Sequence, residues 1–184
     1  QKKLAGELPV LNLRTDRLRP PIQSYNGAVY PFKISQKLTQ QLNELARKEE
    51  ATLYMTLLAA FQVLLYRYSG QEDILVGSPT SGRTRSEFSY IVGYFVDLVV
   101  MRADLSGNLS FRDFLSQVRH TVIEALEHQD YPFALLVERL DSINRDSSYS
   151  PIFQVFFFLH NFLESQYMQK LLFGSTKTSI DWDG

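Results

Sequence analysis

The apolar residues of two segments, Leu38–Ala46 and Phe111–Leu126, recur at the three- and four-residue spacing of an amphipathic helix. A serine suited to cap a helix stands before each segment, Ser35 before the first and Ser110 before the second. Polar and charged residues fill most of the remaining positions. The pattern therefore predicts two helices, each with one face packed on a core.

Two further helices are predicted from other signals. Residues 52–68 are apolar nearly all round, and Ser69-Gly70 follows them as a common helix end, so we expect this helix to be buried. Pro132 can stand in the first turn of a shorter helix, because its missing N–H is not needed there.

Short apolar runs bounded by turn residues predict the strands. Residues 73–78 are expected to form a buried strand with neighbours on both sides, and residues 94–103 and 152–159 two more strands. Tyr30–Ile34 can form a short additional strand. This order of strands and helices predicts an α/β fold, a mixed sheet with helices packed on it.

The chain divides into three stretches. Residues 1–28 contain Pro9, Pro20 and Pro21, which forbid helix over most of their length and predict an extended connector. Residues 29–160 carry the predicted helices and strands. Residues 161–184 mix aromatic and polar residues without a clear period, and we assign them only as a tail.

The composition narrows the classes of protein. A chain of 184 residues, 45% hydrophobic and with 13 Phe and 10 Tyr, can build one well-filled core. A net charge of −1 argues against nucleic-acid binding, and no run of like charge suggests an anionic membrane surface. The absence of cysteine excludes disulfides and favours a cytoplasmic location. No signal peptide or membrane span is expected, and because Gln1 is not Met we expect an excised piece of a longer protein.

No catalytic constellation is complete in these residues. His120 and His128 lie two helical turns apart, whereas a metal pair on a helix needs one turn, and His160 is distant in sequence, so no metal site is expected. The segment at 77–79 lacks the second glycine of a nucleophile turn, and 82–83 lacks the lysine of a phosphate loop. The residues alone therefore indicate only an α/β domain.

Two stretches are more specific. The first is Ile91–Arg102, with the sequence IVGYFVDLVVMR, and the second is His128–Phe133, HQDYPF, followed closely by Leu-Val-Glu. In this order, with one amphipathic helix between them, they resemble the later motifs of condensation domains from nonribosomal peptide synthetases. Weaker matches lie at 4–17, 73–83 and 146–155. The active-site signature of that family, two adjacent histidines followed by Asp-Gly, has no counterpart here. The chain thus resembles the C-terminal lobe, and we expect no catalytic residue in it and no activity from it alone.

The resemblance implies a particular architecture and reaction. Two lobes of the chloramphenicol-acetyltransferase type form a V, and phosphopantetheine arms of carrier proteins enter the tunnel between them from opposite faces. An amine on one arm attacks a thioester on the other, and a histidine of the N-terminal lobe assists. The C-terminal lobe would supply tunnel wall, acceptor-side surface and a loop that bridges to the other lobe. The implied partners are the N-terminal lobe, carrier proteins and an adenylation domain, with no cofactor bound by this chain.

Other functions stay open at this stage. The chain can instead be a non-catalytic scaffold or carrier-docking module, or a lobe of an epimerisation domain, a cyclisation domain or a CoA-dependent acyltransferase. Aromatic residues around Phe153–Phe158 would permit self-association if the partner lobe is absent.

Three residues are candidates for the tunnel or the substrate-facing surface. Asp97 stands where the family commonly has Asn, and the resemblance implies that it faces the tunnel; the alternative is an exposed position on a half-buried strand. Arg83, in a loop after a strand, can pair with a pantetheine phosphate or an inter-lobe carboxylate, or be a solvated loop arginine. Gln154, a polar residue within an apolar run, can anchor a neighbouring segment or face the tunnel.

The remaining motif residues are expected to be structural. We expect His128 to end its helix and Asp130 to fix a turn between two helices. The full structural set is Gly93, Phe95, Arg102, His128, Asp130, Pro132, Phe133 and Pro151.

Overall fold

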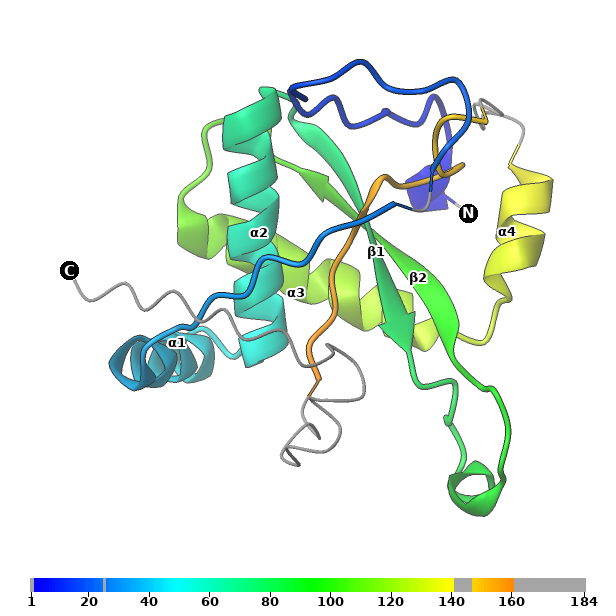
Figure 1. Ribbon diagram of the computed structural model, residues 1–184. Coiled ribbons are helices and arrows are strands. Elements are labelled where there is room, and N and C mark those ends of the chain that lie inside the picture. The colour runs from blue at the N-terminus through cyan, green and yellow to red at the C-terminus, as the bar shows by residue number, and fades with distance from the viewer. Residues whose placement is uncertain (1, 25, 141–146, 161–184) are drawn as a thin grey trace.

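The computed structural model describes residues 2–24, 26–140 and 147–160. Their centre is a three-stranded mixed sheet in the order β2-β1-β3 (Figure 1). β1 (Asp73–Thr80) pairs antiparallel with β2 (Asp97–Asp104) and parallel with β3 (Val155–Phe156). The predicted α/β fold is therefore confirmed, and the strand at 73–78 has neighbours on both sides as expected.

Local sequence signals set the helices. Ser35 and Ser110 accept backbone N–H groups at 3.2 and 3.3 Å, so the two predicted caps are confirmed. Gly70, at φ 72°, ends the second helix in the left-handed conformation that favours glycine. Pro132 is the N-cap residue of the shortest α-helix, so it stands one position before the first helical turn, where we expected it. The described α-helices are α1 (Gln36–Lys48), α2 (Leu53–Ser69), α3 (Phe111–Glu127) and α4 (Phe133–Arg139).

The two faces of the sheet bury separate cores. Residues alternate along β1, so Ile74 and Val76 belong to a larger core with α2 and α3, while Leu75 belongs to a smaller one. In the smaller core Ile152 and Phe153 pack with α4 and with Leu4. α3 packs in the larger core and α4 in the smaller one, so the two helices cover opposite faces of the sheet. The sheet is thus covered on both faces, although unequally.

The expected strand at Tyr30–Ile34 does not form. The segment has no assigned secondary structure, and its large side chains Tyr30 and Phe32 are exposed. A strand needs a neighbour for its backbone bonds, and within the described residues none lies beside this segment. Alternating apolar residues alone were therefore insufficient.

Two of the strands are shorter than expected, whereas β1 is two residues longer. β2 begins at Asp97 and not at Tyr94, because the preceding residues belong to a loop. The strand expected over 152–159 shrinks to the two residues of β3. Two of the residues expected at the start of this strand make other contacts. Phe153 packs in the smaller core, and Gln154 accepts a hydrogen bond from the N-terminal connector.

The second helix is not buried all round. Leu64 and Tyr68 of α2 are 50% and 73% exposed, whereas Leu58 and Ala59 are fully buried. α2 packs on β1, α1 and α3 over part of its surface only. The prediction that this helix is buried all round was wrong, because the apolar composition of a helix does not show which of its sides other elements cover.

The N-terminal connector is bonded to the lobe at several points. After the short 3-10 helix η1 (Lys2–Leu4), the Leu11 amide donates to Gln154 Oε1 at 2.8 Å and the Asn12 amide donates to Gln71 Oε1 at 2.6 Å. Further along, the Gln23 amide donates to the Ser147 carbonyl at 3.1 Å. The boundary between residues 28 and 29 stays a prediction. Residues 141–146 and the tail at 161–184 lie outside the described residues.

Candidate functional site

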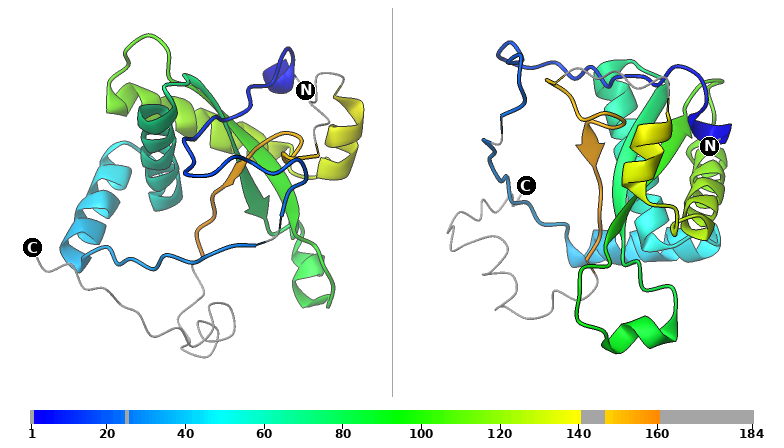
Figure 2. Two further views of the ribbon diagram at one scale, coloured as in Figure 1. Left: turned by 45° about the horizontal axis from the view of Figure 1, so that its top comes forward. Right: turned by 90° about the vertical axis from the view of Figure 1, so that its right-hand side faces the viewer.

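The loop between β1 and β2 projects beyond the ends of both strands (Figures 1 and 2). We call residues 81–96 the hairpin arm. It leaves β1 after Thr80, forms the short 3-10 helix η2 (Ser86–Tyr90) and returns to β2 at Asp97. The arm ends with residues 91–96, the first half of the Ile91–Arg102 stretch that carries the family resemblance; we call that stretch the glycine-aromatic motif.

The hairpin arm has a small packed interior of its own. The rings of Phe88 and Phe95 lie 5.5 Å apart, and the Arg83 guanidinium lies 4.3 Å from the centre of the Phe95 ring. Arg83 also donates to the Phe88 carbonyl. Gly82 has φ 61°, and a Cβ there would lie 1.8 Å from the Phe95 carbonyl oxygen, so this position requires glycine. Local contacts thus hold the arm together.

The outer surface of the arm is apolar and exposed. Tyr90 and Tyr94 are 95% and 89% exposed, and Val92 is fully exposed. Ile91 is partly exposed between them. We call Tyr90, Ile91, Val92 and Tyr94 the arm tip. Clustered apolar side chains on a projecting loop are typical of a surface that another protein segment covers.

Asp97 lies at the base of the arm. Its carboxylate accepts the Leu98 amide at 2.8 Å and the Phe133 amide at 3.3 Å. Phe133 is the first residue of α4, so the carboxylate joins the start of β2 to the start of that helix. The side chain is half-buried, and its role toward a tunnel stays a prediction.

The other two tunnel candidates have different surroundings. Arg83 lies inside the hairpin arm, where its contacts are to Phe88 and Phe95. Gln154 directly precedes β3, on the other side of β1 from β2. Its side-chain oxygen accepts the Leu11 amide, and its side-chain N–H donates to the Ser150 carbonyl at 3.3 Å. The structure therefore brings Arg83 and Asp97 onto one hairpin and gives Gln154 an anchoring role elsewhere.

The structural set divides into two groups by contact. In the arm, a Cβ at Gly93 would lie 3.3 Å from the Phe95 ring, so the glycine allows close approach. Arg102, on β2, donates to both carboxylate oxygens of Asp73 at 2.9 and 2.6 Å, and this hydrogen bonding raises the pKa of its guanidinium. Arg102 also donates to the Lys3 carbonyl at 2.8 Å, which fastens the connector to the sheet.

The second group is the turn that joins α3 to α4. His128 is the C-cap of α3, as expected. Asp130 accepts the Thr84 hydroxyl at 3.3 Å, and the Phe133 ring lies 5.6 Å from that of Phe153. Pro151 belongs to neither group; it is exposed and directly precedes the buried Ile152.

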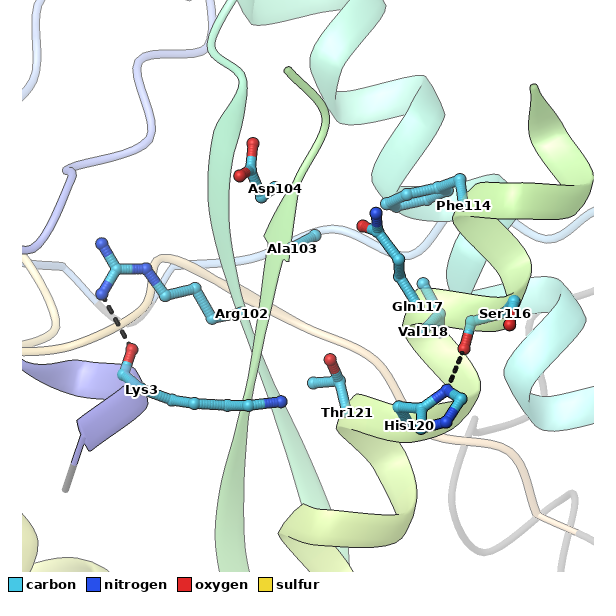
Figure 3. Close-up of a pocket in the computed structure, with 10 residues that line it drawn as sticks. All are labelled: Lys3, Arg102, Ala103, Asp104, Phe114, Ser116, Gln117, Val118, His120 and Thr121. Atoms are coloured by element: carbon cyan, nitrogen blue, oxygen red, sulfur yellow. Dashed lines mark hydrogen bonds between the residues drawn. The ribbon is translucent and has the colours of Figure 1, made fainter. Parts of the chain in front are cut away.

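A groove of about 500 Å³ lies at the opposite end of β2 (Figure 3). Lys3, Arg102, Asp104, Gln117 and His120 are among the side chains that line it. Several of these groups already have partners, since Lys3 pairs with Glu124 and His120 bonds the Ser116 carbonyl at 2.8 Å. The groove lies near Asp104 and not near Asp97, so it is separate from the arm.

The part of the chain that the structure describes holds no group of His, Cys, Asp and Glu side chains that could bind a metal. Within the same residues, no helix is long and apolar enough to cross a membrane.

The fold and motifs define a lobe of the condensation-domain type, and comparison with known proteins establishes the family. The family model described as "Condensation domain" matches residues 1–180, so the chain belongs to this family and the resemblance of its motifs is confirmed. It is 54% identical over 162 residues to a linear gramicidin synthase protein of Brevibacillus parabrevis, covering 88% of this chain and 3% of that protein. It is 48% identical over 160 residues to a plipastatin synthase protein of Bacillus subtilis, covering 87% of this chain and 6% of that protein.

Solved structures share the fold. A four-domain nonribosomal peptide synthetase bound to AMP and glycine matches with a TM-score of 0.82 and 28% identity, over 92% of this chain and 13% of that one. The X-domain from teicoplanin biosynthesis, in complex with OxyB, matches with a TM-score of 0.77 and 27% identity, over 84% of this chain and 34% of that one. The chain thus has the chloramphenicol-acetyltransferase-like fold of condensation domains and spans only a small part of its relatives.

The sequence reasoning did not identify the arm tip. The predicted strand at 94–103 includes Tyr94, and alternate side chains of such a strand would be half-buried, while residues 79–90 carry no predicted helix or strand. One signal was available, because Tyr90–Tyr94 holds four apolar or aromatic residues around Gly93 with no polar residue between them.

Proposed function

We propose that the chain forms part of the C-terminal lobe of a condensation domain in a nonribosomal peptide synthetase or a polyketide hybrid. In the parent reaction, the amine on an acceptor arm attacks the carbonyl carbon of a donor thioester. The C–N bond forms, the C–S bond breaks, and the donor arm leaves as a thiol after the amine has lost a proton. The lobe contributes tunnel wall and acceptor-side surface.

The exposed arm tip is the observation that carries this proposal. A lobe that meets a second lobe needs a surface that is ordered before contact and apolar where contact occurs. The hairpin arm has both properties, because Phe88, Phe95 and Arg83 pack inside it while Tyr90, Val92 and Tyr94 are exposed to solvent. Tyrosine is also common at the centre of protein interfaces.

The remaining components come from partners. The catalytic histidine would belong to the N-terminal lobe, and the phosphopantetheine arms to carrier proteins that work with a neighbouring adenylation domain in the cytoplasm. Asp97 and Arg83 remain candidates for the tunnel side of this lobe, supported by their shared place at the arm, and Gln154 is retained as a weaker candidate.

The test supplies the N-terminal lobe in trans and measures both complex formation and amide product from loaded carrier proteins. We expect product only when both lobes are present. Tyr94→Asp should abolish the complex, because it places a charge in the interface, whereas Tyr68→Asp, a matched change at an exposed tyrosine of α2, should not. Amide product from this chain alone, or equal effects of the two variants, would refute the proposal.

A second candidate is a non-catalytic docking module for a partner protein. The similarity to an X-domain solved in complex with OxyB favours it. A stable lobe complex that binds a partner protein but forms no amide, with every carrier protein loaded, would support this candidate. Association of the chain with itself through the arm tip would be visible as a larger species by size measurement, and Tyr94→Asp would remove it.

A further inference from the structure

Both legs of the hairpin arm are tied to the same turn of the lobe. On the outgoing leg, the Thr84 hydroxyl donates to the Asp130 carboxylate at 3.3 Å. Directly after the returning leg, at the first residue of β2, the Asp97 carboxylate accepts the Phe133 amide at 3.3 Å. These pairs are 46 and 36 residues apart in the sequence, so they are tertiary contacts and do not arise from local turn geometry.

The turn itself is fixed in the smaller core. Its last residue, Phe133, places its ring 5.6 Å from the ring of Phe153. Phe153 is buried and lies against Gly77 at the centre of β1. A continuous set of contacts therefore leads from the central strand through Phe153 and Phe133 to Asp97.

The contacts inside the arm are of another kind. Within the described residues, its interior contacts join Arg83, Phe88 and Phe95, which all belong to the arm. Such contacts preserve the shape of the arm, but they do not determine the direction in which it leaves the sheet. That direction depends on the strand ends and on the two bonds to the turn.

We propose that Asp97 and Thr84 are positioning residues, which set the direction of the hairpin arm by bonding its two legs to the turn at 128–133. Asp97 acts through its oxygen atoms as a hydrogen-bond acceptor and not through its charge. An amide at this position keeps the acceptor, whereas a methyl group removes it. The bond lies at the base of the arm, so a small change there moves the arm tip furthest.

The absence of cysteine permits a direct test on the chain alone. Spin labels on cysteines introduced by Ser89→Cys, in η2, and Gln117→Cys, on the exposed side of α3, report the distance from the arm to the lobe. We expect a narrow distance distribution in the parent and in Asp97→Asn, and a broad or shifted one in Asp97→Ala. The double variant Asp97→Ala with Thr84→Val should broaden it further.

A second label pair separates loss of arm direction from loss of fold. Ala60→Cys with Gln117→Cys spans α2 and α3 and should give the same distribution in every variant. If Asp97→Ala also disturbs this pair, Thr84→Val alone, at an exposed contact, becomes the deciding variant. An unchanged distribution for the first pair in Thr84→Val and in the double variant would overturn the proposal.

Hydrogen exchange gives an independent readout at the bonded atom. The Phe133 amide should exchange about fivefold faster in Asp97→Ala than in the parent, as expected for loss of one typical hydrogen bond, and at the parent rate in Asp97→Asn. Equal acceleration in both variants would assign the effect to charge and overturn the acceptor role. Neither experiment uses a partner lobe, so its result is independent of whether amide formation is observed.

Discussion

Replacing Gly77 with alanine is expected to destabilise the chain, because the sheet has no room for a side chain at this position. A Cβ built at Gly77 would lie 2.3 Å from the Cε2 and Cζ atoms of Phe153, well inside van der Waals contact. The ring cannot withdraw freely, since it packs against Phe133 at 5.6 Å and Phe156 at 6.1 Å. Either the ring or the central strand must therefore move.

The magnitude follows from two opposing effects. Overpacking a filled core typically costs about 1–3 kcal/mol, while replacing glycine by alanine lowers the entropy of the unfolded chain and returns about 0.4–1 kcal/mol. A net destabilisation of about 1–2 kcal/mol is expected. With a urea m-value of about 2 kcal/mol/M, the midpoint of unfolding should fall by about 0.5–1 M.

Equilibrium unfolding in urea measures this shift, and two further variants identify its cause. Gly27→Ala is the control, because a Cβ at Gly27 meets no atom within 4 Å. Phe153→Leu removes the clashing ring atoms, so Gly77→Ala should cost less in that background. If Gly77→Ala leaves the midpoint unchanged, or costs as much in the Phe153→Leu background as in the parent, the steric reasoning is refuted.

Three other predictions concern buried polar groups and the arm. Gln62 is buried with its Oε1 atom unbonded among the described residues, so Gln62→Leu should raise the free energy of unfolding by about 1–3 kcal/mol in urea titrations. Burial raises the pKa of Tyr54 above its ordinary value of 10.0, although the bond to Ser78 opposes this shift. Because the folded-state pKa is raised, this contribution to stability should be fully present below pH 10.0 and lost as pH rises through the raised value; Tyr54→Phe, measured against pH, should lack this alkaline loss. Gly82→Ala should disrupt the packing of Phe88 on Phe95, visible as altered aromatic proton shifts, whereas an unchanged spectrum would contradict the need for glycine there.

The sequence predicted most where the controlling interactions are local. Ser35 and Ser110 cap helices through bonds that span three residues, and Gly70 ends α2 through its own backbone conformation. Such signals lie within one window of sequence. The helix predictions accordingly hold to within a residue or two at their capped ends.

Strand prediction failed where the formation of a strand depends on a second strand that pairs with it. Tyr30–Ile34 has the alternation of a strand but no partner among the described residues. β1, in contrast, pairs with β2 along its length and with β3 at Val76 and Gly77. The sequence also could not show that Asp97 bonds Phe133, because those residues meet only after β2 and α3 have packed. The motifs were recognisable as a family pattern, but their mutual contact is a property of the fold.

The contact between the two motifs suggests why they occur together. The glycine-aromatic motif builds the returning leg of the arm, where Gly93, together with Gly82 of the outgoing leg, allows Phe95 to lie close to the backbone. The second motif builds the turn that holds the arm through Asp130 and Phe133. An arm that is packed internally but free in direction would lose orientational freedom when it docks, and this loss would weaken binding. Bonds from both legs to a turn seated on the core reduce that loss before any partner arrives.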